Sequence, residues 1–323
     1  MKISILTVCF SLLLQCCTYQ DSLEIELQSP KLILNSVLSA NEEPYLYVGK
    51  VFSPTEKIIA DHFINNANVL LYENSTFVGS LIHKQNGVYK LPSFKIKEGK
   101  NYQFKVKVNG YPDASNIPVL IPKNVESNSV IFDNNTVYPT ESYSSGSTDY
   151  YKGRLLSVKL PSTISEKYYG LSVNGTKNGS DVNGNIYPIE VGTTSLFKLN
   201  TDCYKHQYLI TNIDYNLVTQ AQQAMILYNA SCFGKEKTMG VVVQTFGTVH
   251  TPDKDGKYYS STIDRLEATI VTLSEEYFIY SKNMKVISGI DNAFFEPKPV
   301  YTNVINGYGV VVAINKKVVV FNL

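Results

Sequence analysis

The sequence predicts a mainly β protein, with an N-terminal immunoglobulin-like β-sandwich and a larger C-terminal β-rich domain that carries two short helices. Short segments rich in Val, Ile, Leu and Tyr recur along the chain, and Asn-Gly, Asp-Gly and Glu-Gly pairs favourable for tight turns separate them. The 24 tyrosines suit half-buried strands. A chain of 323 residues is too long for one ordinary domain, so two domains are expected.

The first segment is typical of a signal peptide. Lys2 supplies a positive charge, and residues 3–14 are almost entirely apolar. This run is too short to cross a bilayer as a helix but has the length of the apolar core of a secretory signal. Because the sequence becomes polar directly after Cys16 and Cys17, without an A-x-A-like cleavage site, residues 1–17 are predicted to be a lipoprotein signal peptide.

The acylated residue is predicted to be Cys17. Counting back from it places Leu14 at the third position and the small Cys16 directly before the cut, as a lipoprotein signal requires. Cys16 is the alternative, although it places the bulkier Gln15 against the cut. Residues 18–29 would then form a tether to the outer membrane. An ordinary secretory signal with incidental cysteines is the remaining interpretation.

Charge and composition argue against nucleic acid as a partner. The formal net charge is +1, so no bulk electrostatic attraction to phosphate is expected. Only Arg154 and Arg265 could offer a bidentate guanidinium fork.

The cysteines that remain after signal cleavage form an even pair. Cys203 and Cys232 are predicted to form a disulfide, because the expected compartment is oxidising. Closing that loop would stabilise the fold by roughly 3 to 4 kcal/mol in the chain-entropy model. The alternative is a metal site made of Cys203, His206 and Cys232, which lacks a convincing fourth ligand.

The N-terminal sandwich is predicted at residues 30–123. Residues 102–108 alternate strictly between apolar and polar side chains and should bury one face. Seven or so short strands in about ninety residues is the spacing of an immunoglobulin-like sandwich. The predicted strands are residues 31–38, 45–52, 67–72, 77–83, 87–91, 102–108 and 117–121.

The C-terminal domain is predicted at residues 124–323. Ser, Asn and Thr accumulate at its start, and residues 140–149 are predicted to form an exposed loop. Residues 309–314 and 317–321 are predicted to form a terminal hairpin. Further strands are expected at residues 155–160, 168–173, 206–213, 239–246 and 266–273.

Two segments break the strand pattern. Residues 216–228 carry apolar side chains at helical spacing. Ser274 can cap a helix that runs to about residue 286, with Glu275 and Glu276 favourable in its first turn. Both helices are expected to be packing elements.

No catalytic, metal or cofactor site is predicted. Residues 170–174 resemble a nucleophile elbow, but the second glycine comes one place late. Residues 253–256 and 181–185 resemble the beginnings of calcium loops but lack the required glycine and glutamate spacing, so hairpin turns are expected there.

The C-terminal part resembles a known family. The segments TIVTLSEEYFIYSKNM and AFFEPKPVYTNVINGYGVVVAI contain a strand, a Tyr-rich helix and the turn Asn303-Val304-Ile305-Asn306-Gly307-Tyr308-Gly309 before the last strand. This is similar to the signature of Bacteroidota lipoproteins of domain-of-unknown-function family 4249. The N-terminal segments KLILNSVLS, ANVLLYEN and NGVYKLPSFKIKEGKNYQFKV are also similar. Physically, the Asn-Gly-x-Gly stretch indicates a turn with positive φ rather than a catalytic loop.

The resemblance implies an outer-membrane lipoprotein, often encoded near TonB-dependent transporters and without an established activity. We therefore expect a non-enzymatic accessory or binding component of such a transporter, facing the cell surface or the periplasm. The alternative is a fimbrillin-like structural subunit or adhesin. Fimbrial subunits typically need release of an N-terminal strand after Arg, and no arginine precedes Arg154. A hydrolase has no candidate residues.

Overall fold

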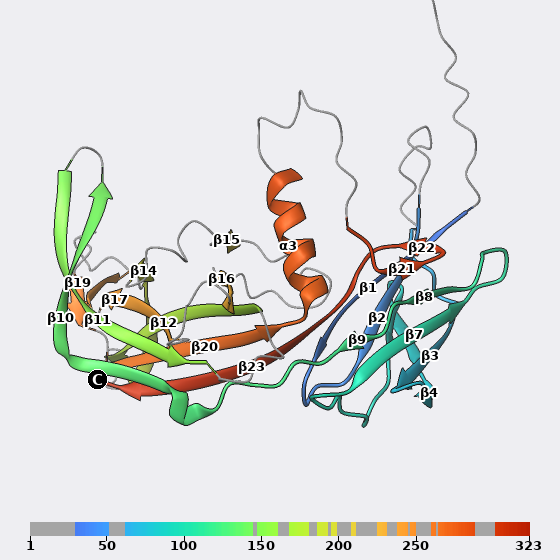
Figure 1. Cartoon of the computed structure of the whole chain (residues 1–323), viewed down its shortest axis with the longest axis horizontal. Coiled ribbons are helices and arrows are strands. Elements are labelled where there is room, and N and C mark those ends of the chain that lie inside the picture. The colour runs from blue at the N-terminus through green and yellow to red at the C-terminus, as the bar shows by residue number, and fades with distance from the viewer. Residues whose placement is uncertain are drawn as a thin grey trace, which may run out of the picture.

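The protein is mainly β, with three sheets and helix α3 among the residues that the computed structural model describes (Figure 1). Those residues are 30–51, 62–144, 147–160, 168–180, 186–192, 195–198, 208–210, 225–230, 238–244, 246–249, 260–262, 264–287 and 301–323. The prediction of a mainly β fold is confirmed.

Two sheets face each other in the N-terminal part. One contains β1 (Leu32–Ser39), β2 (Tyr45–Lys50), β6 (Val88–Lys90) and β5 (Ile82–Gln85) in that order. The other contains β8 (Ala114–Asn116), β7 (Asn101–Lys107), β3 (Asn68–Glu73) and β4 (Thr76–Ser80), and β9 (Val119–Leu120) also pairs with β7.

Alternation along the strands builds the core between these two sheets. Tyr102, Phe104 and Val106 of β7 are fully buried, as the strict alternation of residues 102–108 predicts. They belong to one apolar cluster with Leu34 of β1 and Leu46 of β2. Each strand therefore contributes every second side chain to a shared core.

Strands from the end of the chain join the same sandwich. β21 (Val304–Ile305) pairs with β8, and β22 (Gly307–Tyr308) pairs in parallel with β1. Val304 and Val311 lie in the N-terminal apolar cluster. Residues 304–311 are thus part of the N-terminal body.

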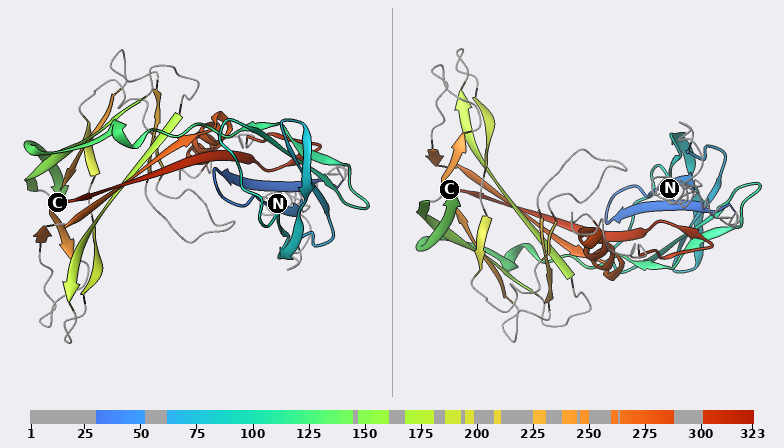
Figure 2. Two further views of the ribbon diagram at one scale, coloured as in Figure 1. Left: turned by 90° about the horizontal axis from the view of Figure 1, so that it is seen from below. Right: turned by 90° about the horizontal axis from the view of Figure 1, so that it is seen from above.

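The last strand, β23 (Val311–Asn322), connects the two halves (Figure 2). Its first residues pair in parallel with β1, and from Ile314 onward it pairs antiparallel with β20 (Arg265–Leu273). The predicted terminal hairpin is therefore wrong. Asn315 and Lys316 stay extended and pair with Thr272 and Val271 of β20. β23 therefore continues without a turn, because it pairs first with β1 and then with β20.

The shared sheet continues through the C-terminal half. Beyond β20 it contains β12 (Tyr168–Ser180), β13 (Ile186–Gly192), β18 (Phe246–Val249) and β19 (Ser260–Thr262), while β16 (Met225–Asn229) pairs with β12 and β15 (Tyr208–Ile210). After the short 3-10 helix η1 (Ser127–Ser129), a four-stranded sheet contains β10 (Val130–Ser144), β11 (Ser147–Lys159), β17 (Thr238–Gln244) and β14 (Ser195–Lys198). Leu156, Leu171 and Ile270 share the buried cluster between these sheets.

The predicted loop at residues 140–149 is wrong for the residues that the structure describes there. These residues belong to β10 and β11, which stay paired from Thr140 opposite Tyr151 to Ser144 opposite Ser147. Figure 1 shows this hairpin as an arm that rises at the left. Thr and Tyr favour strands, so a Ser-, Thr- and Tyr-rich segment is compatible with a solvated hairpin as well as with a loop.

The helix predicted at residues 216–228 is wrong for residues 225–228, which lie in β16; residues 216–224 lie outside the described residues. Tyr228, Leu227 and Ile226 pair with Tyr169, Gly170 and Leu171 of β12. A short apolar run has the same composition in a buried strand as in a packed helix, and strand pairing decided the outcome here.

The second predicted helix is confirmed as α3 (Glu275–Ile287). Ser274 caps it, because its Oγ accepts a hydrogen bond from the backbone N–H of Tyr277 at 3.4 Å. The same Oγ accepts the backbone N–H of Ala313 at 3.2 Å, which ties the start of the helix to β23. Tyr277 and Phe278 pack with Val312 and Ile314.

Candidate functional site

The turn recognised in the sequence, residues 303–309, lies where the C-terminal segment meets the N-terminal sandwich; we call it the signature turn. The buried Asn303 side chain donates from Nδ2 to the carbonyl oxygen of Val311 at 2.7 Å and accepts the Val311 N–H on Oδ1 at 2.9 Å. One side-chain amide thus reproduces the pair of hydrogen bonds that a neighbouring strand would make. It fastens the turn to the beginning of β23.

Close backbone packing explains the glycines of the signature turn. Gly309 has φ 98°, and a Cβ built on it would overlap the carbonyl oxygen of Leu34 and lie 2.6 Å from Asn35 Oδ1. Gly307 has no positive φ, but a Cβ there would lie 2.7 Å from the carbonyl oxygen of Leu32. Both glycines allow the turn to lie directly against β1.

Two asparagines complete this contact. Asn35 of β1 accepts the backbone N–H of Val310 on Oδ1 at 2.9 Å. Asn306 has φ 58° and donates from its side-chain amide to the carbonyl oxygen of Asp113 at 3.1 Å. The prediction that this turn needs positive φ is therefore confirmed at Asn306 and Gly309. The signature turn has a structural role: its side chains are apolar, hydroxyl or amide groups, and they hold the turn against β1 and β23.

A second polar group lies where the two halves meet, around the buried Asn315; we call it the junction cluster (Glu98, Pro122, Asn124 and Asn315). Asn315 of β23 is 3% exposed and donates from Nδ2 to Glu98 Oε2 at 3.0 Å and to the carbonyl oxygen of Pro122 at 2.9 Å. Its Oδ1 accepts from the side chain of Asn124 at 3.0 Å. Asn124 also donates to the carbonyl oxygen of Lys316. The cluster joins the segment that leaves the sandwich to the strand that returns to it.

Two of these asparagines occupy unusual positions in the sequence, although no catalytic or metal-site motif contains them. Asn35 and Asn315 stand inside the apolar runs LILNSVL and VVVAINKKVVV. Asn is depleted in strands, and a buried amide must find hydrogen-bond partners. An asparagine inside an apolar strand segment therefore indicates a fixed polar contact, although it does not name the partner.

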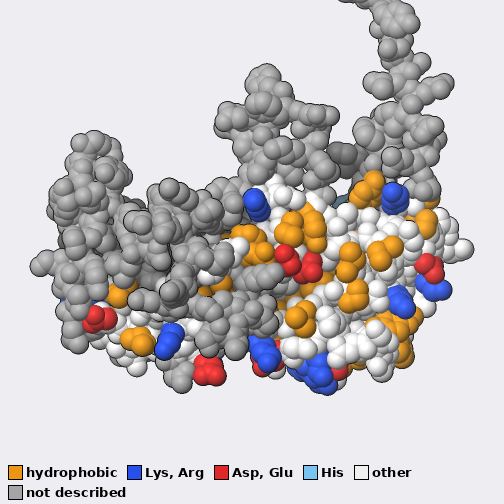
Figure 3. All heavy atoms as spheres, in the orientation of Figure 1, with side chains coloured by type: hydrophobic (Ala, Val, Ile, Leu, Met, Phe, Trp, Pro, Cys, Tyr) orange, Lys and Arg blue, Asp and Glu red, His pale blue; other side chains and the backbone are white. Residues whose placement is uncertain are grey.

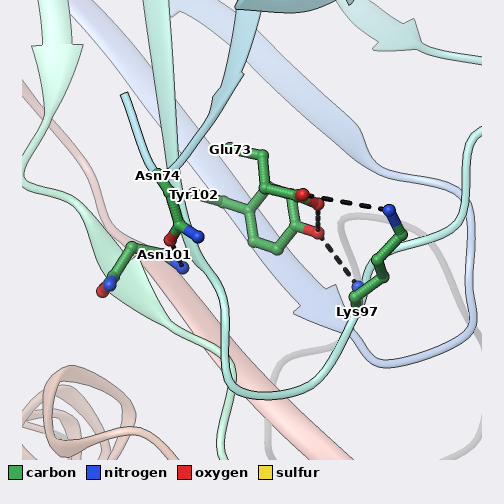
Figure 4. A network of polar contacts seen from close by, with 5 residues as sticks. All are labelled: Glu73, Asn74, Lys97, Asn101 and Tyr102. Atoms are coloured by element: carbon green, nitrogen blue, oxygen red, sulfur yellow. Dashed lines mark hydrogen bonds and ion pairs between the residues drawn. The ribbon is translucent and has the colours of Figure 1, made fainter. Parts of the chain in front are cut away.

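A third polar group lies at the end of the sandwich away from the signature turn (Figure 4). The hydroxyl of the fully buried Tyr102 donates to Glu73 Oε2 at 2.5 Å and accepts the backbone N–H of Lys97 at 3.0 Å. Lys97 Nζ lies 3.8 Å from Glu73 Oε1. Asn74 and Asn101 connect the adjacent strand ends through backbone and side-chain hydrogen bonds.

Burial raises the pKa of Tyr102 above its ordinary value, and the neighbouring Glu73 carboxylate raises it further. The phenol therefore keeps its proton at neutral pH and cannot serve as a general base. Its role is to hold the loop around Lys97 against the end of β3.

The Tyr102→Phe variant is expected to lose about 1–2 kcal/mol in the free energy of unfolding at neutral pH, since Glu73 and the Lys97 N–H lose a buried partner. The raised pKa means that the contribution of Tyr102 is complete below about pH 10, where tyrosine ionises in the unfolded chain, and is lost at higher pH. Urea unfolding of both proteins at neutral pH and between about pH 9.5 and 11.5 measures this. The variant should lose stability less steeply with pH, and parallel pH profiles would contradict the assignment.

The Tyr-rich helix of the signature packs through its first turn. The Tyr168 ring stacks on Phe278 with centroids 4.2 Å apart. Burial raises the pKa of Tyr168, and Glu275 raises it further; burial and then Glu276 and Glu275 raise the pKa of Tyr301. Both phenols are therefore neutral packing groups.

Most of the residues predicted to be acylated, to form a disulfide or to resemble a calcium loop lie outside the described residues. These are Cys16 and Cys17, Cys203 and Cys232, the signal peptide and tether (residues 1–29), and the segments 181–185 and 253–256. The segment that resembles a nucleophile elbow lies inside β12, where Ser172 is buried and paired with Thr269. It is therefore a strand interior and not the strand-to-helix turn that an elbow requires.

The described ranges contain neither a cluster of metal ligands nor a helix that could span a membrane. No group of three or more His, Cys, Asp or Glu residues there could hold a metal ion. Within the same part of the chain, no helix combines the length and apolar character needed to cross a membrane.

These features define a class of protein: a mainly β chain whose C-terminal segment returns to the N-terminal sandwich and is fastened there by buried amides and close-packed glycines. The family model described as domain of unknown function DUF4249 matches residues 20–318. The chain therefore belongs to this family.

Other comparisons add little. No curated protein matches the chain. Among solved structures, it is similar to the crystal structure of a protein from Corynebacterium diphtheriae that is described as membrane anchored, with 11% identity and a TM-score of 0.20. The match covers 76% of this chain and 54% of that one, so this chain spans about half the length of the solved protein. A TM-score at this level does not establish a shared fold.

Proposed function

We propose that this protein is a non-enzymatic lipoprotein of the Bacteroidota outer membrane, acylated at Cys17, that acts as an accessory or binding component of a TonB-dependent transporter. The observation that carries the proposal is the apolar segment of residues 3–14, which ends on Cys16 and Cys17 before a polar tether. The N-terminal sandwich is proposed to be immunoglobulin-like, in keeping with its two facing sheets. Multiple acyl chains would hold the protein to the membrane stably, since each buried methylene contributes about 0.8 kcal/mol.

The position of β1 supports an anchor at the N-terminus. Residue 30 leads directly into β1, which lies between β2 and β23 in the large sheet. A tether attached there would be joined to the centre of the sheet that connects the two halves. The length of the tether would then limit how far the folded body can lie from the membrane.

The same observation disfavours the fimbrial alternative. A fimbrial subunit that loses its N-terminal strand would here lose β1 or part of it. That loss would leave β2, β22 and β23 without a partner on one side and would open the N-terminal core. We therefore keep the accessory role as the proposed function.

Labelling with a fatty-acid probe tests the anchor, and affinity capture tests the partner. The wild-type protein should incorporate the probe, Cys17→Ser should lose it, and Cys16→Ser should keep it because serine is also small enough to precede the cut. Capture of the native protein from detergent-solubilised outer membranes should recover a TonB-dependent transporter. An unlabelled wild type would overturn the anchor, and high-mass ladders of the protein itself would favour the fimbrial role.

The disulfide between Cys203 and Cys232 is proposed on the cysteine count alone. A thiol reagent added to the denatured, unreduced mature protein should label neither cysteine, and prior reduction should make both reactive. Breaking the bond should cost roughly 3 to 4 kcal/mol in the chain-entropy model. Labelling of both residues without reduction would remove the disulfide.

A further inference from the structure

One end of the N-terminal sandwich exposes apolar side chains around the point where the chain enters β1; we call this end the exit face (Lys31, Val51, Ile305 and Tyr308). Ile305 is 49% exposed, Val51 42% and Tyr308 39%. Figure 1 shows β21 and β22 at this end, beside the start of β1. These residues come from three separate segments of the chain, so the exposure is a property of the folded surface.

Contacts join the residues of the exit face. The backbone N–H of Val51 donates to the carbonyl oxygen of Lys31 at 3.1 Å, and Lys31 Nζ lies 4.9 Å from the centre of the Tyr308 ring. Ile305 precedes Tyr308 by three residues in the signature turn and pairs with Ser115 of β8.

The charges of the sandwich differ between its two ends. At the exit face Lys31 lies over the Tyr308 ring, and the nearby Asp113 is paired with Lys107 at 2.9 Å. Beyond the opposite ends of the same strands, Glu43 and Glu73 face Lys95 and Lys97. Figure 3 shows hydrophobic side chains next to a lysine or arginine at the upper right, over β21 and β22.

A bilayer interface fits this chemistry. Tyrosine with an apolar ring and a polar tip, aliphatic side chains and a lysine are the groups that settle between lipid headgroups and acyl chains. The proposed tether, residues 18–29, enters the fold at Lys31 and spans at most ~40 Å when fully extended. The membrane that holds the lipid therefore lies within reach of the exit face.

We propose that the exit face rests on the lipid bilayer interface and orients the body of the protein on the membrane. The proposal rests on the acylation at Cys17 proposed above. In this orientation Val51, Ile305 and Tyr308 contact lipid, and the end that carries Glu43 and Glu73 points away from the bilayer.

The chain contains no tryptophan, so one introduced indole is a specific reporter. The acylated full-length protein carries Tyr308→Trp or, as a second reporter on the exit face, Ile305→Trp. Phe77→Trp is the matched control, because Phe77 is 53% exposed in β4 and lies near the end that carries Glu73. Each variant is incorporated into phosphatidylethanolamine and phosphatidylglycerol vesicles that contain lipids brominated near the glycerol end of their acyl chains.

Bromine should reduce the fluorescence at positions 308 and 305 by roughly half, because interfacial side chains reach ~5–10 Å into the boundary between headgroups and acyl chains. Fluorescence at position 77 should not change. If the acylated protein floats with vesicles but neither exit-face reporter is quenched, the exit face is exposed to water or covered by another protein. The proposed orientation is then wrong, whereas the proposed lipid anchor is supported. If the wild type does not float with vesicles, the proposed anchor itself fails.

Discussion

Replacing Gly309 by alanine is expected to lower the free energy of unfolding by about 3–4 kcal/mol. Gly309 has φ 98°, a conformation that an L-residue rarely adopts, and an added Cβ would overlap the carbonyl oxygen of Leu34. The backbone of Leu34 belongs to β1 and cannot move without disturbing its pairing with β2. The methyl group would therefore push the signature turn away from β1.

Gly110→Ala is the control for this experiment. Gly110 has φ 84°, but a Cβ there would meet nothing within 4 Å. This variant should lose only the conformational cost of positive φ, about 1 kcal/mol. Urea unfolding followed by far-UV circular dichroism measures both, and equal losses in the two variants would show that close packing against β1 contributes nothing.

Replacing Asn315 by alanine is expected to cost about 2–4 kcal/mol, because the substitution removes a buried amide that makes three hydrogen bonds. The carbonyl oxygen of Pro122 loses its donor from Asn315, and the Asn124 side chain loses an acceptor. Since these groups connect residues 122–124 with β23, the loss should also loosen the junction. Limited proteolysis between residues 120 and 126 should then become faster, as should unfolding in urea.

Asn322→Ala is the matched control in the same strand. Asn322 is exposed and pairs through its backbone with Arg265, so its side chain can be removed with a change within about 0.5 kcal/mol. A similar loss of stability in both variants would mean that strand propensity, and not the junction cluster, explains the effect of Asn315.

Local sequence patterns correctly predicted the strands, helix and turn whose conformation depends only on a few neighbouring residues. The alternation of residues 102–108 predicted the buried face of β7, and Ser274 with Glu275 and Glu276 predicted the beginning of α3. The Asn-Gly-x-Gly stretch predicted positive φ, which the structure places at Asn306 and Gly309. In each case the chain's own dihedral preferences, caps or periodicity are sufficient.

Composition did not predict the elements that strand pairing decides. Residues 140–144 and 147–149 form strands because they pair across a hairpin. Residues 225–228 form a strand because β12 offers an open edge to them. Asn315 and Lys316 were predicted to form a turn. They are extended instead, because β20 pairs with β23 from the residue at which its pairing with β1 ends.

The sequence by itself determined that this protein is mainly β, where its alternating strands and its capped helix lie, and which turn needs positive φ. Only the tertiary structure decided that the chain's last strands complete its first sandwich. The contact between Val310 and Asn35 joins residues 275 apart in the sequence, and no local preference specifies such a partner. Strand pairing is set by the hydrogen bonds and buried side chains that become available when both strands are present, so it is a property of the assembled fold.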